Sequence, residues 1–139
     1  MNRKIFVNLP VRDLKRSKAF FGALGFAFNP QFTDENAACM IISDDIYAML
    51  LKREFFATFT PRAVCEATAA TEVLVCLSCE SRAEVADLAG RALAAGATRH
   101  AEPKDHGFML QDGFADPDGH IWELVYMEPS ALEGPSAAS

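Results

Sequence analysis

The chain has 139 residues and a mass of 15.2 kDa, the size of one compact domain that can bury a core without disulfides or a structural metal. Half of the residues are hydrophobic and 23% are charged, a composition that excludes disorder and fibrous repeats. The chain has 13 Lys and Arg residues and 19 Asp and Glu residues, which gives a net charge of -6. A negative net charge is unfavourable for binding the phosphate backbone of nucleic acids.

The first apolar stretch is short and is interrupted by Asn8 and Pro10, so the sequence predicts neither a signal peptide nor a membrane span. We therefore expect a cytoplasmic protein. In such a chain free thiols are favoured for the four cysteines, Cys39, Cys65, Cys76 and Cys79. Cys76 and Cys79 have the C-x-x-C spacing, but residues three apart in a strand point to opposite faces. A redox or zinc role for this pair is the alternative.

The first half of the chain predicts the order β-α-β-β-β. A strand is expected over 4–11, where Ile, Phe, Val and Leu dominate. Asp13 is a good N-cap for the helix that follows, and Gly25 is expected to end it. Three strands are then expected over 26–32, 37–43 and 46–51. Residues 52–70 predict a short helix and a long connection, whose phenylalanines pack in the core or cover a cavity as a lid.

The second half predicts the same order again. A strand is expected over 71–79, followed by an amphipathic helix that Gly96 ends and whose apolar positions are Val85, Leu88, Ala89, Ala92 and Leu93. Three short strands are expected around 97–100, 107–112 and 120–127. The run 116–119, Asp-Pro-Asp-Gly, is typical of a tight turn, although its carboxylates could also form a functional cluster.

This repeat predicts one domain over 1–139 that is built from two similar modules. Module one spans about 1–60 and module two about 70–128. The last residues, 129–139, are rich in Ser, Ala and Pro and predict a flexible tail.

Two motifs carry a family resemblance. The run Val11-Arg12-Asp13-Leu14, followed by Ser17, Phe20-Phe21 and Leu24-Gly25-Phe26, resembles the opening of the vicinal oxygen chelate superfamily of glyoxalase I, bleomycin-resistance proteins and extradiol dioxygenases. The run 114–124, Phe-Ala-Asp-Pro-Asp-Gly-His-Ile-Trp-Glu-Leu, is similar to the closing turn and strand of these proteins. The chain looks closest to small predicted lactoylglutathione lyases.

The resemblance implies an α+β fold, in which two βαβββ modules form a cupped, half-open mixed β-barrel with the helices outside. Such a sheet leaves edges and an apolar face that small family members usually cover with a second chain, so we expect a homodimer.

The resemblance also implies where a metal would be held. In metal-dependent members four inward-facing positions carry His and Glu ligands, and this sequence has Phe6, Leu50, Leu74 and Glu123 at these positions. Only Glu123 offers lone pairs to an ion, so we expect no metal site and no cofactor. A divalent metal held by Glu123 with His106 is the alternative.

Strand alternation predicts a concave surface that binds a small organic molecule. Its expected residues are Phe6, Asn8, Ala48, Leu50, Leu74, Cys76, Ile121, Glu123 and Val125. Asn8 and Glu123 are the polar groups that would orient the ligand, and His106 lies in a loop from which it could contact the ligand or remain idle in solvent. If Glu123 is buried, desolvation would raise its pKa and suit it to proton transfer, but a structural role fits equally.

Two functions follow from these residues. The first is a small-molecule-binding protein of the glyoxalase/bleomycin-resistance type without the usual metal site, with no nucleic-acid or membrane partner. The second is a glyoxalase-like lyase or isomerase, or a dioxygenase relative, that uses Glu123 with rebuilt metal ligands or as a lone base. The missing ligands favour the first, because Lewis-acid chemistry needs ligands for the Lewis acid.

Overall fold

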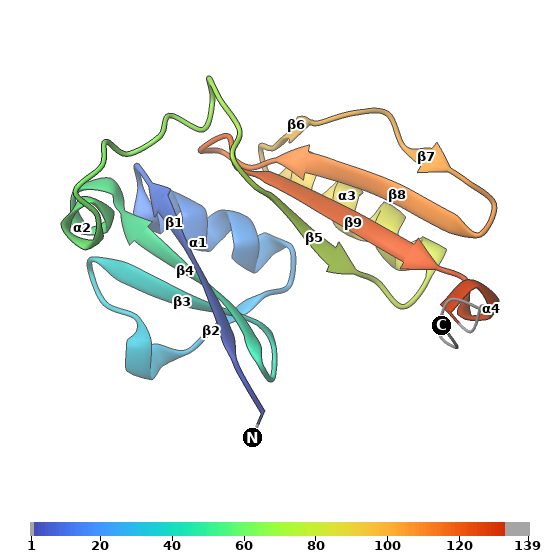
Figure 1. Cartoon of the computed structure of the whole chain (residues 1–139), viewed down its shortest axis with the longest axis horizontal. Coiled ribbons are helices and arrows are strands. Elements are labelled where there is room, and N and C mark those ends of the chain that lie inside the picture. The colour runs from blue at the N-terminus through green and yellow to red at the C-terminus, as the bar shows by residue number, and fades with distance from the viewer. Residues whose placement is uncertain (1, 133–139) are drawn as a thin grey trace. The chain divides into compact units, whose positions relative to one another are not determined.

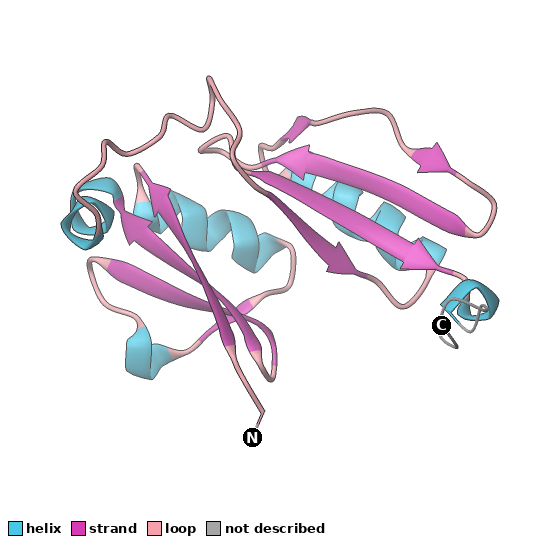
Figure 2. Ribbon diagram, in the orientation of Figure 1, coloured by secondary structure: helices cyan, strands magenta, loops and turns pink. Residues whose placement is uncertain are grey.

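The computed structural model describes residues 2–132 and divides into two compact units, 1–70 and 71–139. Each unit is a module in which a mixed sheet carries a helix across one face (Figure 1). The order of the main elements is β-α-β-β-β in the first module, and the second repeats it with one additional short strand, which confirms the predicted α+β class with two repeated modules. Figure 2 shows that both sheets are open.

The first module has a four-stranded sheet in the order β1-β4-β3-β2. Strands β1 and β4 run parallel, and the other neighbours are antiparallel. The elements are β1 (Ile5–Val11), α1 (Leu14–Ala23), β2 (Ala27–Phe28), a 3-10 turn (Pro30–Phe32), β3 (Ala37–Ser43), β4 (Ile46–Lys52), α2 (Arg53–Phe56) and a second 3-10 turn (Ala57–Phe59).

The second module repeats this plan with β5-β9-β8-β6, and β7 also pairs with β8. Strands β5 and β9 are parallel, as β1 and β4 are. The elements are β5 (Leu74–Ser78), α3 (Arg82–Ala94), β6 (Thr98–Arg99), β7 (Lys104–Asp105), β8 (Met109–Ala115), β9 (Ile121–Met127) and α4 (Pro129–Leu132).

The two long helices begin and end through the same local chemistry. The side chain of Asp13 accepts a hydrogen bond from the N–H of Arg16, and the side chain of Ser81 accepts one from the N–H of Glu84. Such caps satisfy N–H groups that the first helical turn leaves without a partner. Gly25 and Gly96 follow the helices at φ of 100° and 114°, a conformation that favours glycine.

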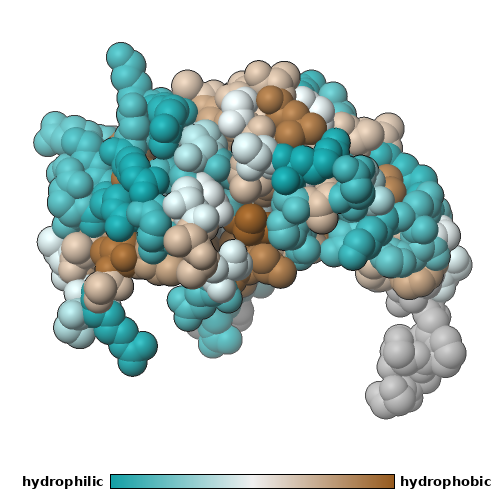
Figure 3. Space-filling view, turned by 90° about the horizontal axis from the view of Figure 1, so that it is seen from above, coloured by the Kyte–Doolittle hydropathy of each residue, from teal (hydrophilic) through white to brown (hydrophobic). Residues whose placement is uncertain are grey.

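Each core lies between the helix and one face of the sheet. In the first module Phe21 and Leu50 are almost fully buried, and in the second Trp122 and Leu124 are. Burying one such side chain contributes about 1.5–3 kcal/mol. The surface in Figure 3 is largely polar, with apolar side chains in small groups between the charged ones.

The expected elements differ from the observed ones mainly at the short strands. The strand expected over 26–32 is a two-residue strand followed by a 3-10 turn, and β7 was not expected. Of the expected tail, 129–132 form α4 and 133–139 lie outside the described residues. Among the described residues, the helices are too short or too polar to cross a membrane.

Candidate functional site

Strand register defines the face of the second sheet that carries Glu123. Glu123 on β9 pairs with Cys76 on β5 and with Gly113 on β8, and paired residues point to the same side of a sheet. Its neighbours along β9, Trp122 and Leu124, are each only 1% exposed beneath α3. Glu123 therefore lies on the face opposite the helix, as the alternation predicted.

Glu123 is half-buried and has a neutral hydrogen-bond partner. Gln111 Nε2, on β8, donates to Glu123 Oε2 at 3.3 Å. In the described part of the chain, no Lys, Arg or His nitrogen forms an ion pair with this carboxylate. The carboxylate is thus held by an amide and keeps its charge uncompensated, which suits it to meet a cation or a proton donor.

Gly113 leaves the side of Glu123 toward β8 without a side chain. A Cβ at this position would lie 2.7 Å from the carbonyl oxygen of Trp122 and 3.3 Å from the Cα of Glu123. Real Cβ atoms do not approach backbone that closely, so the separation of β8 and β9 here requires glycine.

Cys76 lies beside Glu123 on the other neighbouring strand. Loss of surrounding water and the negative charge of Glu123 raise the pKa of the Cys76 thiol. The raised pKa makes this thiol a weaker nucleophile at neutral pH than an ordinary cysteine.

A small pocket of about 70 Å³ opens beside Glu123. It is lined by His100, Ala101, Glu102, Lys104, Gln111, Asp112, Gly113 and Glu123. Asp112 Oδ1 already accepts from Arg99 Nη1 at 3.3 Å, which leaves Glu102 and Glu123 as the other negative groups of the lining and Lys104 as a positive one.

His106 is exposed and does not line this pocket. Its backbone N–H donates to the carbonyl of Met109, and its ring centroid lies 6.3 Å from that of Phe108. The histidine that the fold brings to the Glu123 pocket is His100. Among the described residues, His, Cys, Asp and Glu side chains form no group of three that could hold a metal.

In the first module the register corrects one expected site residue. Phe6 pairs with Tyr47 and Asn8 with Met49, so these four side chains share the face opposite α1. Leu50 points to the helix side, where it is fully buried. Leu50, and Ala48 with it, therefore do not lie on the surface that carries Phe6 and Asn8.

The exposed face of the first module is aromatic. The rings of Phe6 and Tyr47 stack with centroids 4.9 Å apart and planes at 11°, and the Lys4 ammonium lies 5.6 Å from the Tyr47 ring. Phe6 remains 51% exposed, as does Leu74 on the second module. This stack offers a flat surface to a planar group.

The two modules can be compared position by position through their helix caps. Asn8 precedes the cap Asp13 by the same five residues by which Cys76 precedes Ser81. Because Asn8 pairs with Met49 and Cys76 with Glu123, Met49 is the first-module counterpart of Glu123. The sequence reasoning missed Tyr47, Met49, Gln111 and Gly113 as parts of these faces.

The Asp-Pro-Asp-Gly run is a structural turn. Asp116 Oδ1 accepts from the backbone N–H groups of Asp118 and His120 at 2.9 and 3.0 Å, and its Oδ2 accepts from Trp122 Nε1 at 3.0 Å. All of these contacts lie inside the module, so this carboxylate serves the fold.

Comparison with known proteins identifies the fold. The model of the bleomycin resistance protein-like N-terminal family matches residues 3–43. A hypothetical protein from S. aureus has 27% identity and a TM-score of 0.76, over 91% of this chain and 95% of that one. A glyoxalase-related enzyme from Fulvimarina pelagi has 23% identity and a TM-score of 0.75, over 91% and 88%.

The bleomycin resistance determinant of transposon Tn5 has 21% identity and a TM-score of 0.62, over 91% of this chain and 99% of that one. The chain has the fold of the vicinal oxygen chelate superfamily. The resemblance that the opening and closing motifs carry is thereby confirmed. No curated protein matches the chain.

The donor atoms on the two faces do not fit the metal site of this superfamily. The first module presents the phenyl ring of Phe6, the amide of Asn8 and the thioether of Met49, and the second presents the thiol of Cys76 and the carboxylate of Glu123. Divalent ions in such sites need several imidazole or carboxylate ligands.

Proposed function

We propose that this protein binds a small organic molecule on its Glu123 face, without a resident metal. The observation that carries the proposal is the half-buried carboxylate of Glu123, which is held by Gln111, bordered by Gly113 and, among the described residues, not engaged in an ion pair, although Lys104 lines the same pocket. An arrangement with one oriented charge on a mainly apolar face is typical of a binding site.

The distribution of charge supports a cationic ligand. Residues 71–139 contain four Lys and Arg against twelve Asp and Glu, whereas residues 1–70 contain nine against seven. The second module thus carries a net charge of -8 and the first +2. A negative field around Glu123 raises the local concentration of cations and repels anions.

A matched pair of variants tests the proposal. Bleomycin is the first probe, because a protein of this fold is named as its resistance determinant, and benzamidinium and benzoate follow as small ligands of opposite charge. Binding is measured by calorimetry for the native protein, for Glu123→Gln and for Glu80→Gln, which removes the same charge at an exposed position outside the pocket.

We expect binding of a cationic probe that Glu123→Gln weakens about tenfold, the effect of losing one charged contact, and that Glu80→Gln leaves unchanged. Metal analysis of protein purified without added ions completes the test. Stoichiometric zinc, nickel, manganese or iron would contradict the metal-free proposal, and equal affinity of Glu123→Gln for every probe would contradict the site.

The same carboxylate supports a second candidate, a glyoxalase-like lyase or isomerase in which Glu123 acts as a lone base. Its support is that Glu123 has a neutral partner and lines a small pocket, so it could accept a proton from a bound substrate. The assay is isomerisation of the hemithioacetal of glutathione and methylglyoxal, with and without added divalent ions. Activity that Glu123→Gln abolishes would establish this candidate over simple binding.

A homodimer and a cytoplasmic location stay predictions. Light scattering at micromolar concentration tests the dimer, and a monomer would contradict it.

A further inference from the structure

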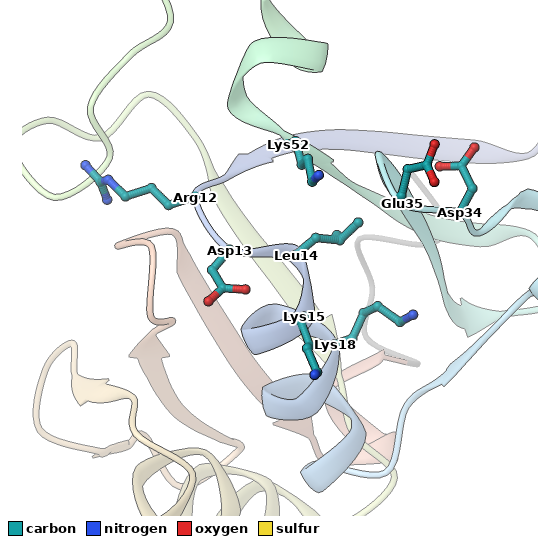
Figure 4. A pocket seen from close by; sticks show the side chains of 8 residues that line it. All are labelled: Arg12, Asp13, Leu14, Lys15, Lys18, Asp34, Glu35 and Lys52. Atoms are coloured by element: carbon teal, nitrogen blue, oxygen red, sulfur yellow. The ribbon is translucent and has the colours of Figure 1, made fainter.

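The first module contains a larger hollow, of about 510 Å³, at the N-terminal end of α1. It lies between this helix, the end of β4 and the loop that leads into β3 (Figure 4). It is lined by Arg12, Asp13, Leu14, Lys15, Lys18, Asp34, Glu35 and Lys52. Seven of these eight residues are charged, so the hollow suits a polar ligand.

Three lysines bring uncompensated ammonium groups to this hollow. Lys15 and Lys18 come from α1, and Lys52 comes from the end of β4 on the other side (Figure 4). Within residues 2–132, none of the three ammonium groups makes an ion pair or a hydrogen bond. Lys18 and Lys52 are nevertheless half-buried.

The carboxylates that line the hollow are largely engaged by the backbone. Asp13 Oδ1 accepts from the N–H of Arg16 at 3.1 Å. Asp34 Oδ1 accepts from the N–H groups of Asn36 and Ala37 at 2.8 and 3.0 Å. Glu35 is the lining carboxylate that has no such contact among the described residues.

The fourth cation of the lining, Arg12, already has a partner. Arg12 forms an ion pair with Glu66, which also lies 3.8 Å from Arg53. The lining therefore holds three lysine ammonium groups without an ion pair among the described residues, together with three carboxylates, two of which accept hydrogen bonds from the backbone and keep their charge. An anion bound between Lys18 and Lys52 would supply the missing partners.

We propose that this hollow binds a small phosphorylated polyol. A phosphate carries close to two negative charges at neutral pH and accepts hydrogen bonds from several ammonium groups at once. The hollow is larger than one phosphate needs, and Leu14 is its one apolar side chain, so the rest of the ligand is polar. Glu35 and the second oxygens of Asp13 and Asp34 can accept from its hydroxyl groups.

The test uses ribose 5-phosphate, inorganic phosphate and ribose as a matched series. Binding is followed by amide shifts of residues 14–18 and 34–36 in ¹⁵N-labelled protein at constant ionic strength. We expect ribose 5-phosphate to bind more tightly than phosphate, and ribose alone to leave these amides unmoved.

Lys18→Gln and Lys52→Gln should each weaken ribose 5-phosphate about tenfold, the effect of one lost charged contact. Lys4→Gln is the control, since Lys4 is exposed in the same module and pairs with Asp45 outside the hollow. Vesicles that contain phosphatidic acid distinguish a lipid headgroup from a free phosphate compound.

Three outcomes would overturn the proposal: no shift at millimolar ribose 5-phosphate, equal affinity of the Lys18 and control variants, or binding to the vesicles alone. These outcomes leave the Glu123 site untouched, because that site lies in the other module and is probed with cations.

Discussion

The buried carboxylate of Asp116 should stabilise the second module through its hydrogen bond with Trp122. Asp116 is 5% exposed and accepts from two backbone N–H groups at Oδ1 and from the indole N–H at Oδ2. Asp116→Asn keeps the size and the first two contacts. In the variant, the NH2 group of the asparagine replaces Oδ2, so two hydrogen-bond donors, this NH2 group and the indole N–H of Trp122, face each other about 3.0 Å apart.

The magnitude follows from these contacts. The substitution removes one charge-assisted hydrogen bond and leaves a buried indole N–H without an acceptor, which together cost about 2–4 kcal/mol. A flipped amide would place its oxygen at the indole N–H again. Its NH2 group would then face the two backbone N–H donors of Asp118 and His120. Relief of the desolvation of a buried charge reduces the cost, so we expect about 2–3 kcal/mol.

Urea unfolding followed by circular dichroism measures this cost, and a double-mutant cycle with Trp122→Phe isolates the contact. Removing the indole N–H also removes the donor that opposes the new amide, so the double variant should be more stable than the sum of the single effects predicts. A cost below about 0.5 kcal/mol for Asp116→Asn, or strict additivity in the cycle, would refute the reasoning.

The pH dependence of this effect has a definite sign. Burial raises the pKa of Asp116, and the charge of His120 and the hydrogen bond from Trp122 oppose that rise. Because its pKa is raised in the folded state, the folded chain holds this proton longer than the unfolded chain. The contribution of Asp116 to stability is therefore complete below the ordinary aspartate pKa and decreases as the pH rises through the folded pKa. Asp116→Asn should cost more at acidic than at neutral pH.

Three further predictions concern Gly113 and the cysteines. Gly113→Ala should destabilise the second module by about 1–3 kcal/mol in urea unfolding, since the new methyl group would press on the Trp122 carbonyl; an unchanged midpoint would contradict the close approach of β8 and β9. Iodoacetamide should modify the exposed Cys65 before the buried Cys79, because burial and Glu84 raise the pKa of Cys79 to about 11. Glu123→Gln should speed up the modification of Cys76, and an unchanged rate, read by mass spectrometry, would mean that the two side chains do not interact.

Features that depend on a few neighbouring residues could be predicted from the sequence. Asp13 caps α1, and Gly25 ends it with the positive φ that a residue after a helix often adopts. The turn at 116–119 forms as its composition indicated, with the N–H of Gly119 bonded to the carbonyl of Asp116 at 2.9 Å. Local hydrogen bonding determines each of these, so the sequence contains the whole cause.

The face of a strand could not be predicted where both of its faces are apolar. Along β4, alternate residues Tyr47, Met49 and Leu51 face one side and Ala48 and Leu50 the other, and none of the five is charged. Alternation of polarity, the usual indicator, is absent here. The pairing with β1 decides the faces, and pairing is a tertiary property. On β9 the charge of Glu123 breaks the apolar run, and there the residues predicted to share its face agree with the register.

This difference between neighbours on β4 leads to a last prediction, in which Leu50→Glu and Met49→Glu have opposite outcomes. Leu50 is fully buried on the helix side of the sheet, and it pairs with Ala38, which is also fully buried. A carboxylate there would be desolvated without a partner, a cost of several kcal/mol that is comparable to the whole stability of a small domain.

Met49 is half-buried and lies on the face of Asn8, at the counterpart of Glu123. A carboxylate at Met49 can reach solvent, so we expect a cost of about 1–2 kcal/mol and a folded protein. Circular dichroism and urea unfolding compare the two, and Leu50→Gln and Met49→Gln repeat the comparison without a charge. If Leu50→Glu folds as well as Met49→Glu, the assignment of the two faces of β4 is wrong.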